Sequence, residues 1–390
     1  MSTRIGTEAS FAIADAARLV DVDVVAAYPI TPQTHIVERL SELVADGDLD
    51  AEFVCVESEH SALSACMGSS AAGARTFTAT AGQGLELMHE VLYVASSMRL
   101  PIVMAVVNRA LSGPLNVWGD HSDAMATRDC GWIQYFTENA QEAFDLTLCG
   151  FRIAEDPKVL FPVMIHLDGF NVSHVVESLE MFEKDDLKDF IPAINYPLPL
   201  DPNHPVTMGA FAPPVIYSEC RKAQEEALRL TQQTIVKVWK EFGDRFGRYY
   251  RPVESYRAED AETLLITMGS FSETATAAID SLRDQGQKVG QLRLRLWRPF
   301  PFEELRAAVK SAKHLIVFDR SISYGGPGGP VCSELKSALY RSPNRPGIAN
   351  FVGGLGGRDV IPEQFEHMIT RGREIIDNNL DIEYETIGVR

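Results

Sequence analysis

The sequence runs Val54-Cys55-Val56-Glu57-Ser58-Glu59-His60-Ser61-Ala62 at the point where an apolar segment meets the start of a helix signal. Residues 53–56 are apolar and predict a buried strand. Ser58 is of a residue type that often caps a helix N-terminus. Small residues then recur through Ala72 and would let the helix pack close to a neighbour. This stretch therefore predicts a strand that passes directly into a helix.

Two carboxylates stand at the end of this predicted strand, on Glu57 and Glu59. In open α/β sheets, ligands bind beside the carboxyl ends of the strands. A carboxyl group partly buried at such an edge has a raised pKa and can exchange a proton near neutral pH. The alternative is that both are solvated acids of the first helical turn, which the helix dipole favours. The stretch alone leaves both interpretations open.

Composition and charge limit the class of protein. The chain has 390 residues, of which 45% are hydrophobic and 23% charged, which is typical of a globular protein with two domains. Its net charge of -18 argues against nucleic acid or an anionic membrane as a partner. No apolar run reaches the roughly 18 residues of a membrane span. Residues 1–6 lack the apolar core of a signal peptide, so we expect a cytoplasmic location.

The six cysteines are not arranged as a metal site. None are spaced C-x-x-C, and their neighbours are apolar or small, which predicts reduced and mostly buried thiols. Zinc and iron–sulfur clusters need grouped thiolates. We therefore expect no cluster and no metal ligand in this chain.

Helix and strand signals alternate through the first half of the chain. The expected strands are 22–27, 53–56, 76–81, 101–107 and 163–167, and the expected helices are 8–19, 32–44, 58 onward, 85–98 and 139–154. This alternation predicts an α/β fold with a parallel sheet covered on both faces. Residues 108–129 have no periodicity, and a loop of that length is often functional.

A second α/β domain is expected after a change in composition. Residues 191–214 are proline-rich and must be extended, and 218–242 predicts a long helix. We assign residues 1–242 to the first domain, 243–257 to a linker and 258–390 to the second domain. Its expected strands are 263–268, 289–294, 315–319 and 348–352. Glycine-rich loops at 325–330 and 353–357 match no phosphate-binding pattern, so we expect tight turns in close contact with a neighbouring chain.

Several stretches, taken together and in order, resemble one family. They are Ala27–Thr34 with its Tyr-Pro-Ile-Thr-Pro core, Val56–Ala62, Thr76–Leu85, Asn108–Pro114, Gly119–Asp123, Arg128–Trp132 and Gly353–Asp359. The chain resembles the α subunit of multi-subunit 2-oxoacid:ferredoxin oxidoreductases of the pyruvate type, over nearly its whole length. This resemblance implies a thiamine-diphosphate-binding domain of the pyrimidine type followed by a transketolase C-terminal-like domain.

The resemblance also implies roles for individual residues. Glu59 would hydrogen-bond the aminopyrimidine ring of thiamine diphosphate, and Tyr28 and Ile30 would contact the cofactor. Arg109 would clamp the carboxylate of the 2-oxoacid through two parallel hydrogen bonds. The hydroxyl of Thr31 would contact the substrate carboxylate or keto oxygen.

Each of these roles has a structural alternative. Glu57 competes with Glu59, Arg109 could form an ion pair with an acid, and Thr31 could be only a turn residue. His60 is expected to cap or pack. Residues 119–123, with their histidine and aspartates, are expected to hydrogen-bond their own loop backbone.

The implied reaction is the reversible oxidative decarboxylation of pyruvate to acetyl-CoA and CO2, with electrons passed to ferredoxin. Coenzyme A is then a co-substrate, and the [4Fe-4S] clusters lie in partner subunits. No Gly-Asp-Gly occurs in the sequence, so we expect a β subunit to hold magnesium and the diphosphate. Further γ and δ (ferredoxin-like) subunits are implied.

Three other functions stay open at this point. One is a branched-chain enzyme acting on 2-oxoisovalerate, because such enzymes share much of this pattern and Thr31 fits any substrate with one carboxylate. The second is a non-catalytic scaffold subunit that retains the fold, which loss of Glu59 or Arg109 would have favoured. The third is a self-contained thiamine enzyme, against which the missing Gly-Asp-Gly argues.

Overall fold

The first sheet carries the predicted parallel strands. A computed structural model describes residues 3–343 and 345–389, and within them seven strands pair in the order β12-β6-β7-β5-β4-β2-β3. Their bounds are β2 (Val24–Ala27), β3 (Glu52–Cys55), β4 (Thr76–Thr80), β5 (Ile102–Asn108), β6 (Ile133–Phe136), β7 (Val163–Asp168) and β12 (Leu296–Arg298). All but β12 run parallel to their neighbours. The predicted α/β class is confirmed.

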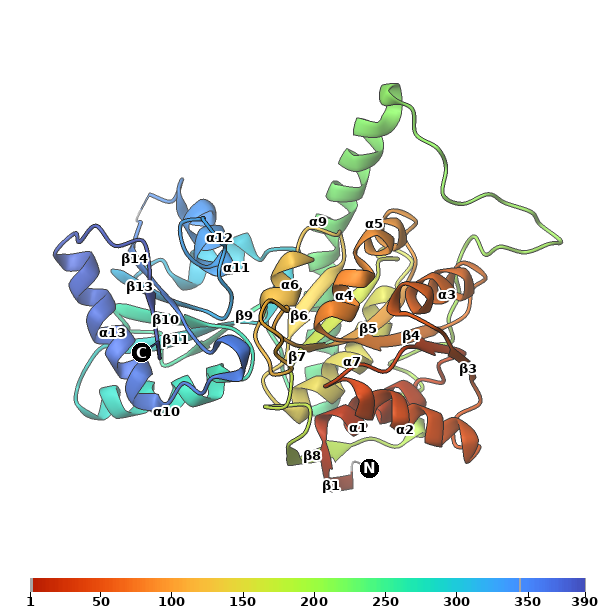
Figure 1. The fold of residues 1–390 in the computed structure, drawn as a ribbon, viewed down its shortest axis with the longest axis horizontal. Helices are drawn as coiled ribbons and strands as arrows, with labels where there is room; N and C mark the ends of the chain where they lie inside the picture. Colours follow the sequence, from red (N-terminus) through yellow and green to blue (C-terminus); the bar gives the residue numbers. More distant parts are fainter. Residues whose placement is uncertain (1–2, 344, 390) are drawn as a thin grey trace.

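Helices cover both faces of this sheet (Figure 1). Along β5, Val103 and Ala105 join the core cluster beneath α1, α2 and α7, whereas Met104 and Val106 join the cluster beneath α3, α4 and α5. Because both faces are buried, such a strand has a continuous apolar sequence. The helix bounds are α1 (Ala9–Leu19), α2 (Thr34–Ala45), α3 (Glu59–Ala71), α4 (Gly82–Leu87), α5 (His89–Ser97) and α7 (Ala140–Ala154).

The second sheet lies beside the first (Figure 1). In the described part of the chain its strand order is β15-β14-β13-β10-β11-β9. The strands are β9 (Val253–Tyr256), β10 (Thr263–Thr267), β11 (Val289–Leu294), β13 (His314–Asp319), β14 (Gly347–Val352) and β15 (Glu385–Thr386). Their faces are covered by α10 (Phe271–Asp284) and α13 (Pro362–Asp377) on one side and by α11 (Phe302–Ala308) and α12 (Pro330–Leu339) on the other.

Two strands join sheets outside the domains that the sequence predicted for them. β9 comes from the segment expected as a linker and pairs with β11 of the second sheet, whereas β12, from the second half, pairs with β6 of the first sheet. The domain boundaries drawn from the sequence stay a prediction.

The structure corrects the expected environment of residues 53–56. β3 is the edge strand of its sheet, Cys55 is exposed and Phe53 is only half-buried, because β2 alone lies beside it. The short strands β6 and β12 were not expected. Nor were β1 (Thr3–Glu8) and β8 (Val176–Met181), which pair antiparallel with each other. Residues 1–2, part of the segment tested for a signal peptide, lie outside the described residues.

The proline-rich segment forms an extended strap that leads into α9 (Pro214–Phe246), whose first half projects from the body of the molecule (Figure 1). The helix begins four residues earlier than predicted, with a proline at its start, where a missing N–H costs nothing. Four cysteines are buried, Cys55 and Cys220 are exposed, and all six are unpaired. Among the described helices, none combines the length and the apolar character needed to cross a bilayer.

Candidate active site

Four strand ends converge at one edge of the first sheet. β3, β2, β4 and β5 are parallel neighbours in that order, so the segments that follow them meet at their carboxyl ends. Ser58 caps α3, as predicted, by accepting a hydrogen bond from the backbone N–H of Ser61 at 3.2 Å. Glu59 is the first residue of the helix, and Glu57 precedes the cap. The side chains of the two glutamates therefore lie in different environments.

Glu57 is the solvated acid of the pair. It is exposed and accepts a hydrogen bond from the hydroxyl of Ser61 at 2.5 Å, which lowers the pKa of the Glu57 carboxyl. Its contacts lie within its own helix turn. The interpretation as a solvated acid near a helix N-terminus therefore holds for Glu57.

Glu59 is buried, with 5% of its surface exposed. Within residues 3–343 and 345–389, no hydrogen bond or ion pair reaches its carboxylate. A Cβ placed on Gly84 would lie 2.6 Å from Glu59 Oε1 and 2.6 Å from Thr80 Oγ1, so these two oxygens border the same glycine. The Thr80 hydroxyl is also buried without a partner. Two unpartnered polar groups thus lie side by side at the strand edge.

Arg109 follows the end of β5 and is 8% exposed. Its Nε donates to the carbonyl of Asn116 at 2.9 Å, and its Nη1 donates to the carbonyl of Thr31 at 3.0 Å. In the described segments it forms no ion pair, so the ion-pair alternative is wrong. Burial lowers the pKa of the guanidinium, while Asp123 opposes this effect. The structure thus brings Arg109 and Thr31 together, through the Thr31 carbonyl and not its hydroxyl.

The Tyr-Pro-Ile-Thr-Pro turn reaches the same edge. Tyr28 is 38% exposed, and Ile30 is half-buried against the core beneath α1 and α2. The buried side chain of Gln33 fixes the turn, because it accepts from the N–H of Ile30 at 3.2 Å and donates to the carbonyl of Ala79 at 2.7 Å. The turn is therefore anchored to the end of β4. Contact of Tyr28 and Ile30 with a cofactor stays a prediction.

The first turn of α4 lies between Glu59 and Arg109, the two main candidates for functional residues. Carbons of the Arg109 side chain lie 3.1 Å from a Cβ placed on Gly82, and Glu59 lies against Gly84. The sequence analysis included both glycines and Thr80 in the stretch Thr76–Leu85 that resembles the family, but it assigned none of them a role. The sequence feature that could have indicated this part of the site is the Gly-Gln-Gly run directly after an apolar strand.

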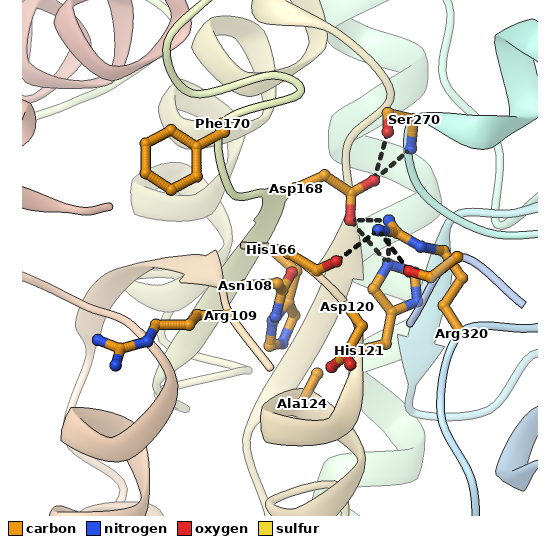
Figure 2. A network of polar contacts seen from close by, with 12 residues as sticks. Asn108, Arg109, Asp120, His121, Ala124, His166, Asp168, Phe170, Ser270 and Arg320 are labelled. Carbon is orange, nitrogen blue, oxygen red and sulfur yellow. Dashed lines mark hydrogen bonds and ion pairs between the residues drawn. The ribbon is translucent and has the colours of Figure 1, made fainter. Parts of the chain in front are cut away.

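The side chain of His121 does not hydrogen-bond the backbone of its own loop, contrary to expectation. Its Nε2 lies 3.0 Å from Asp168 Oδ1, and Asp168 also forms an ion pair with Arg320 and accepts from Ser270 Oγ at 2.5 Å (Figure 2). Burial alone would raise the pKa of Asp168, but Arg320 and His121 hold it well below its usual range. Because Ser270 and Arg320 belong to the second sheet's domain, this cluster joins the two sheets. The Arg109 side chain points away from it (Figure 2).

Other residues considered in the sequence analysis lie away from the carboxyl ends of these strands. His60 lies 3.2 Å from Glu90 on the surface. The loop at 353–357 makes close contacts within the same chain, since a Cβ on Gly357 would clash with the Cβ of Trp118. A cleft of about 590 Å³ separates residues 110–128 from residues 321–330. No group of three or more His, Cys, Asp or Glu in the described residues could hold a metal ion.

Two family models match most of this sequence. Residues 15–240 match the thiamine-diphosphate-binding domain of pyruvate flavodoxin/ferredoxin oxidoreductases, and residues 261–365 match core domain II of pyruvate:ferredoxin oxidoreductase. The chain belongs to the pyruvate:ferredoxin oxidoreductase family. It is therefore a subunit of an oxidoreductase, and the predicted resemblance is confirmed.

Relatives of this oxidoreductase family align along the whole chain. The pyruvate synthase subunit PorA of Thermotoga maritima is 48% identical over 97% of this chain and 95% of the relative. PorA of Methanothermobacter thermautotrophicus is 46% identical over 93% of this chain and 94% of the relative. The ketoisovalerate oxidoreductase subunit VorA of Pyrococcus horikoshii is 43% identical over 96% of this chain and 95% of the relative.

Solved structures confirm the fold expected for this oxidoreductase family. A 2-oxoglutarate:ferredoxin oxidoreductase from Magnetococcus marinus superposes with a TM-score of 0.72 at 20% identity, over 95% of this chain and 65% of that chain. A split-gene transketolase superposes with a TM-score of 0.54 at 10% identity, over 95% of this chain and 99% of that chain. At these identities the likeness concerns the fold alone.

Proposed function

We propose that this chain is the α subunit of a pyruvate:ferredoxin oxidoreductase, which converts pyruvate and coenzyme A reversibly to acetyl-CoA and CO2. The observation that carries this proposal is Glu59, which is 5% exposed at the carboxyl edge of a parallel sheet and whose carboxylate has no partner among the described residues. A carboxylate on a residue so little exposed, and without a partner, is usually completed by a ligand.

The chemistry of the edge fits the aminopyrimidine ring of thiamine diphosphate. That ring offers a nitrogen that can share a proton with Glu59, and the bare backbone of Gly84 leaves room beside the carboxylate. When bound, the cofactor would supply the nucleophile and the electron sink that decarboxylation of a 2-oxoacid needs. Glu59 holds a proton between its carboxylate and the ring nitrogen, and thereby stabilises the reactive tautomer. Tyr28 and Ile30 line the approach.

Arg109 binds the carboxylate of the 2-oxoacid in this proposal. Its guanidinium keeps donors free beyond those given to the carbonyls of Thr31 and Asn116, and no acid of the described segments forms an ion pair with it. A fixed guanidinium with parallel donors suits a carboxylate. The hydroxyl of Thr31, on the exposed turn beside Arg109, would contact the same substrate.

Partner subunits complete this active site. We propose that a β subunit holds magnesium and the diphosphate, since the sequence contains no Gly-Asp-Gly. The [4Fe-4S] clusters would lie in partner subunits, with γ and δ (ferredoxin-like) chains and ferredoxin as the electron acceptor. The six unpaired cysteines suit a reducing, cytoplasmic location.

A second candidate substrate is 2-oxoisovalerate. The similarity to VorA, at 43% identity, equals that to one PorA relative, from Methanosarcina barkeri. Pyruvate is our choice because the other PorA relatives we compared reach 45–48% identity.

The test is reconstitution. The chain would be purified alone and with its co-expressed partners, and dye reduction would be followed with coenzyme A and either pyruvate or 2-oxoisovalerate. We expect the chain alone to be inactive and the complex to prefer pyruvate in kcat/KM. Full turnover by the isolated chain would contradict the shared active site, and a preference for 2-oxoisovalerate would contradict the substrate. A complex that assembles but turns over neither acid would favour the scaffold alternative.

A further inference from the structure

Asp123 is a buried carboxylate that the proposed chemistry does not use. It has no exposed surface and lies in α6 (Ser122–Ala126). As expected, it accepts hydrogen bonds from the backbone of its own loop, at Arg109 and Ala124, but one further bond reaches Gly82 outside that loop. Oδ2 accepts from the backbone N–H of Gly82 at 3.1 Å and of Arg109 at 2.9 Å. Oδ1 accepts from Asn108 Nδ2 at 2.9 Å and from the N–H of Ala124 at 2.7 Å. Both oxygens are therefore fully used.

The two groups bound by Oδ2 belong to the proposed active site. One is the main chain of Arg109, which sets where its side chain leaves β5. The other is Gly82 at the start of α4, over which the carbons of the Arg109 side chain lie, and the next glycine of that turn, Gly84, borders Glu59. A single oxygen atom thus connects the end of β5 to the first turn of α4.

Buried carboxylates are usually stabilised by a cation, and Asp123 has none. Its hydrogen bonds come from backbone and amide groups, and in the described segments it forms no ion pair. Burial raises its pKa to about 7, although the bonds from Arg109 and Asn108 act to lower it. A group this costly to bury needs a reason beyond packing. Asn108, whose side-chain amide oxygen Oδ1 has no partner, stands between Arg109 and His166 in the same network (Figure 2).

We propose that Asp123 is a positioning residue for 2-oxoacid binding, which holds Arg109 and the first turn of α4 in fixed register so that the guanidinium meets the substrate carboxylate beside Glu59. This inference rests on the proposed role of Arg109. Asp123 does not touch the substrate, and it acts through the two backbone N–H groups that it binds.

The experiment compares Asp123→Ala, Asp123→Asn and a matched control in the reconstituted complex. Asp319 is the control, because it is an equally buried aspartate that accepts from two backbone N–H groups (Val331 and Cys332) and one asparagine amide, within the second sheet's domain. We expect Asp123→Ala to raise the KM for pyruvate about tenfold or more, with a smaller change in kcat. Asp319→Ala should lower the melting temperature to a similar degree without moving KM.

Asparagine should rescue the function of Asp123. Its amide oxygen can accept from both Gly82 and Arg109, and the unpartnered oxygen of Asn108 can turn toward the new amide group. We expect the KM of Asp123→Asn to stay within about threefold of the wild-type value, because the two bonds that position Arg109 and Gly82 are kept while only the bond from the N–H of Ala124 is lost. If Asp123→Ala does not assemble, Asn108→Ala, which removes one of the four bonds, should still raise KM by about two- to fivefold.

Arg109→Lys, measured in parallel, separates this inference from the function on which it rests. If Arg109→Lys raises KM and Asp123→Ala does not, the positioning role is wrong and the proposed function stands. If Asp319→Ala raises KM as much as Asp123→Ala, the effect is only structural and the inference fails. If Arg109→Lys leaves KM unchanged, the carboxylate clamp is wrong and the role of Asp123 falls with it.

Discussion

The carboxylate of Glu59 is in direct contact with the backbone of Gly84. A Cβ at position 84 would lie 2.6 Å from Oε1 and 2.8 Å from Cγ of Glu59, closer than side chains tolerate. The helix that begins after β4 thus forms one wall of the Glu59 site, and a side chain at position 84 fits only if Glu59 and Thr80 move.

Gly84→Ala should therefore displace the Glu59 carboxylate without unfolding the chain, since a flexible side chain can move aside. We expect kcat/KM to fall about tenfold or more, with weaker retention of thiamine diphosphate, because the hydrogen bond to the cofactor is misaligned. Gly68→Ala is the control, since nothing lies within 4 Å of its added Cβ. Equal activities for the two variants would reject the Gly84 contact as functional.

Glu59→Gln should keep assembly and lose turnover by roughly 10²–10⁴, the range of a general acid–base contribution. Glutamine can still donate a hydrogen bond, but it cannot hold the proton as a carboxylate does. Glu57→Gln, two residues away and exposed, should retain turnover close to the wild-type value. The measurement is steady-state dye reduction by the purified complex. The assignment reverses if the Glu57 variant is the inactive one.

Arg109→Lys should raise the KM for pyruvate about tenfold or more, because an ammonium cannot form two parallel hydrogen bonds to a carboxylate. It also loses the bonds that hold the guanidinium to Asn116 and Thr31. Arg128→Lys, on the cleft beside residues 110–114, should leave KM unchanged. A KM for the Arg109 variant within about twofold of wild type would exclude a carboxylate clamp.

Arg320→Met should destabilise the folded chain by about 3–5 kcal/mol, because it leaves the Asp168 carboxylate buried without its main counter-charge. Urea unfolding monitored by circular dichroism would measure this loss. Lys240→Ala removes an exposed ion pair with Asp244 and should cause no measurable change. A loss as small for Arg320 as for Lys240 would show that the cluster does not hold the two sheets together.

Asp319→Asn should gain stability relative to wild type as the pH rises from 4 to 8. Burial raises the pKa of Asp319 to about 7 from its ordinary 3.8, so the folded state binds the proton more tightly than the unfolded state does. The free energy of unfolding therefore falls as pH rises through this window, by up to roughly 1.4 kcal/mol per pH unit, and asparagine escapes this loss. Melting temperatures at pH 5 and pH 8 would measure the difference.

The control for this prediction is Asp185→Asn, because a hydrogen bond from Lys188 lowers the pKa of this exposed carboxyl. That variant should show no such gain. A stability difference between Asp319→Asn and wild type that does not change with pH would mean that Asp319 titrates normally in the folded chain.

Local sequence patterns predicted the positions of most helices and strands, but not which distant segments lie beside them in the fold. Apart from β1, the strands and helices before residue 108 were placed to within a few residues, because each is an apolar or amphipathic run, although the helix expected at 85–98 is divided into α4 and α5. β6 and β12 were missed because each has only three or four residues, and β12 pairs with a strand more than 150 positions away. The role of His121 was misjudged for the same reason, since Asp168 and Arg320 are distant in sequence.

The sequence by itself determined that strands bury both faces and alternate with helices, because a continuous apolar strand between amphipathic segments has few other stable arrangements. It also placed Glu59 and Arg109 at strand ends. Only the tertiary structure decided that Glu59 is buried and Glu57 is not, and that Asp123 holds Arg109. The physical reason is that burial and hydrogen bonding at a sheet edge depend on segments from neighbouring strands, here the first turn of α4, which lies more than twenty residues beyond the glutamates.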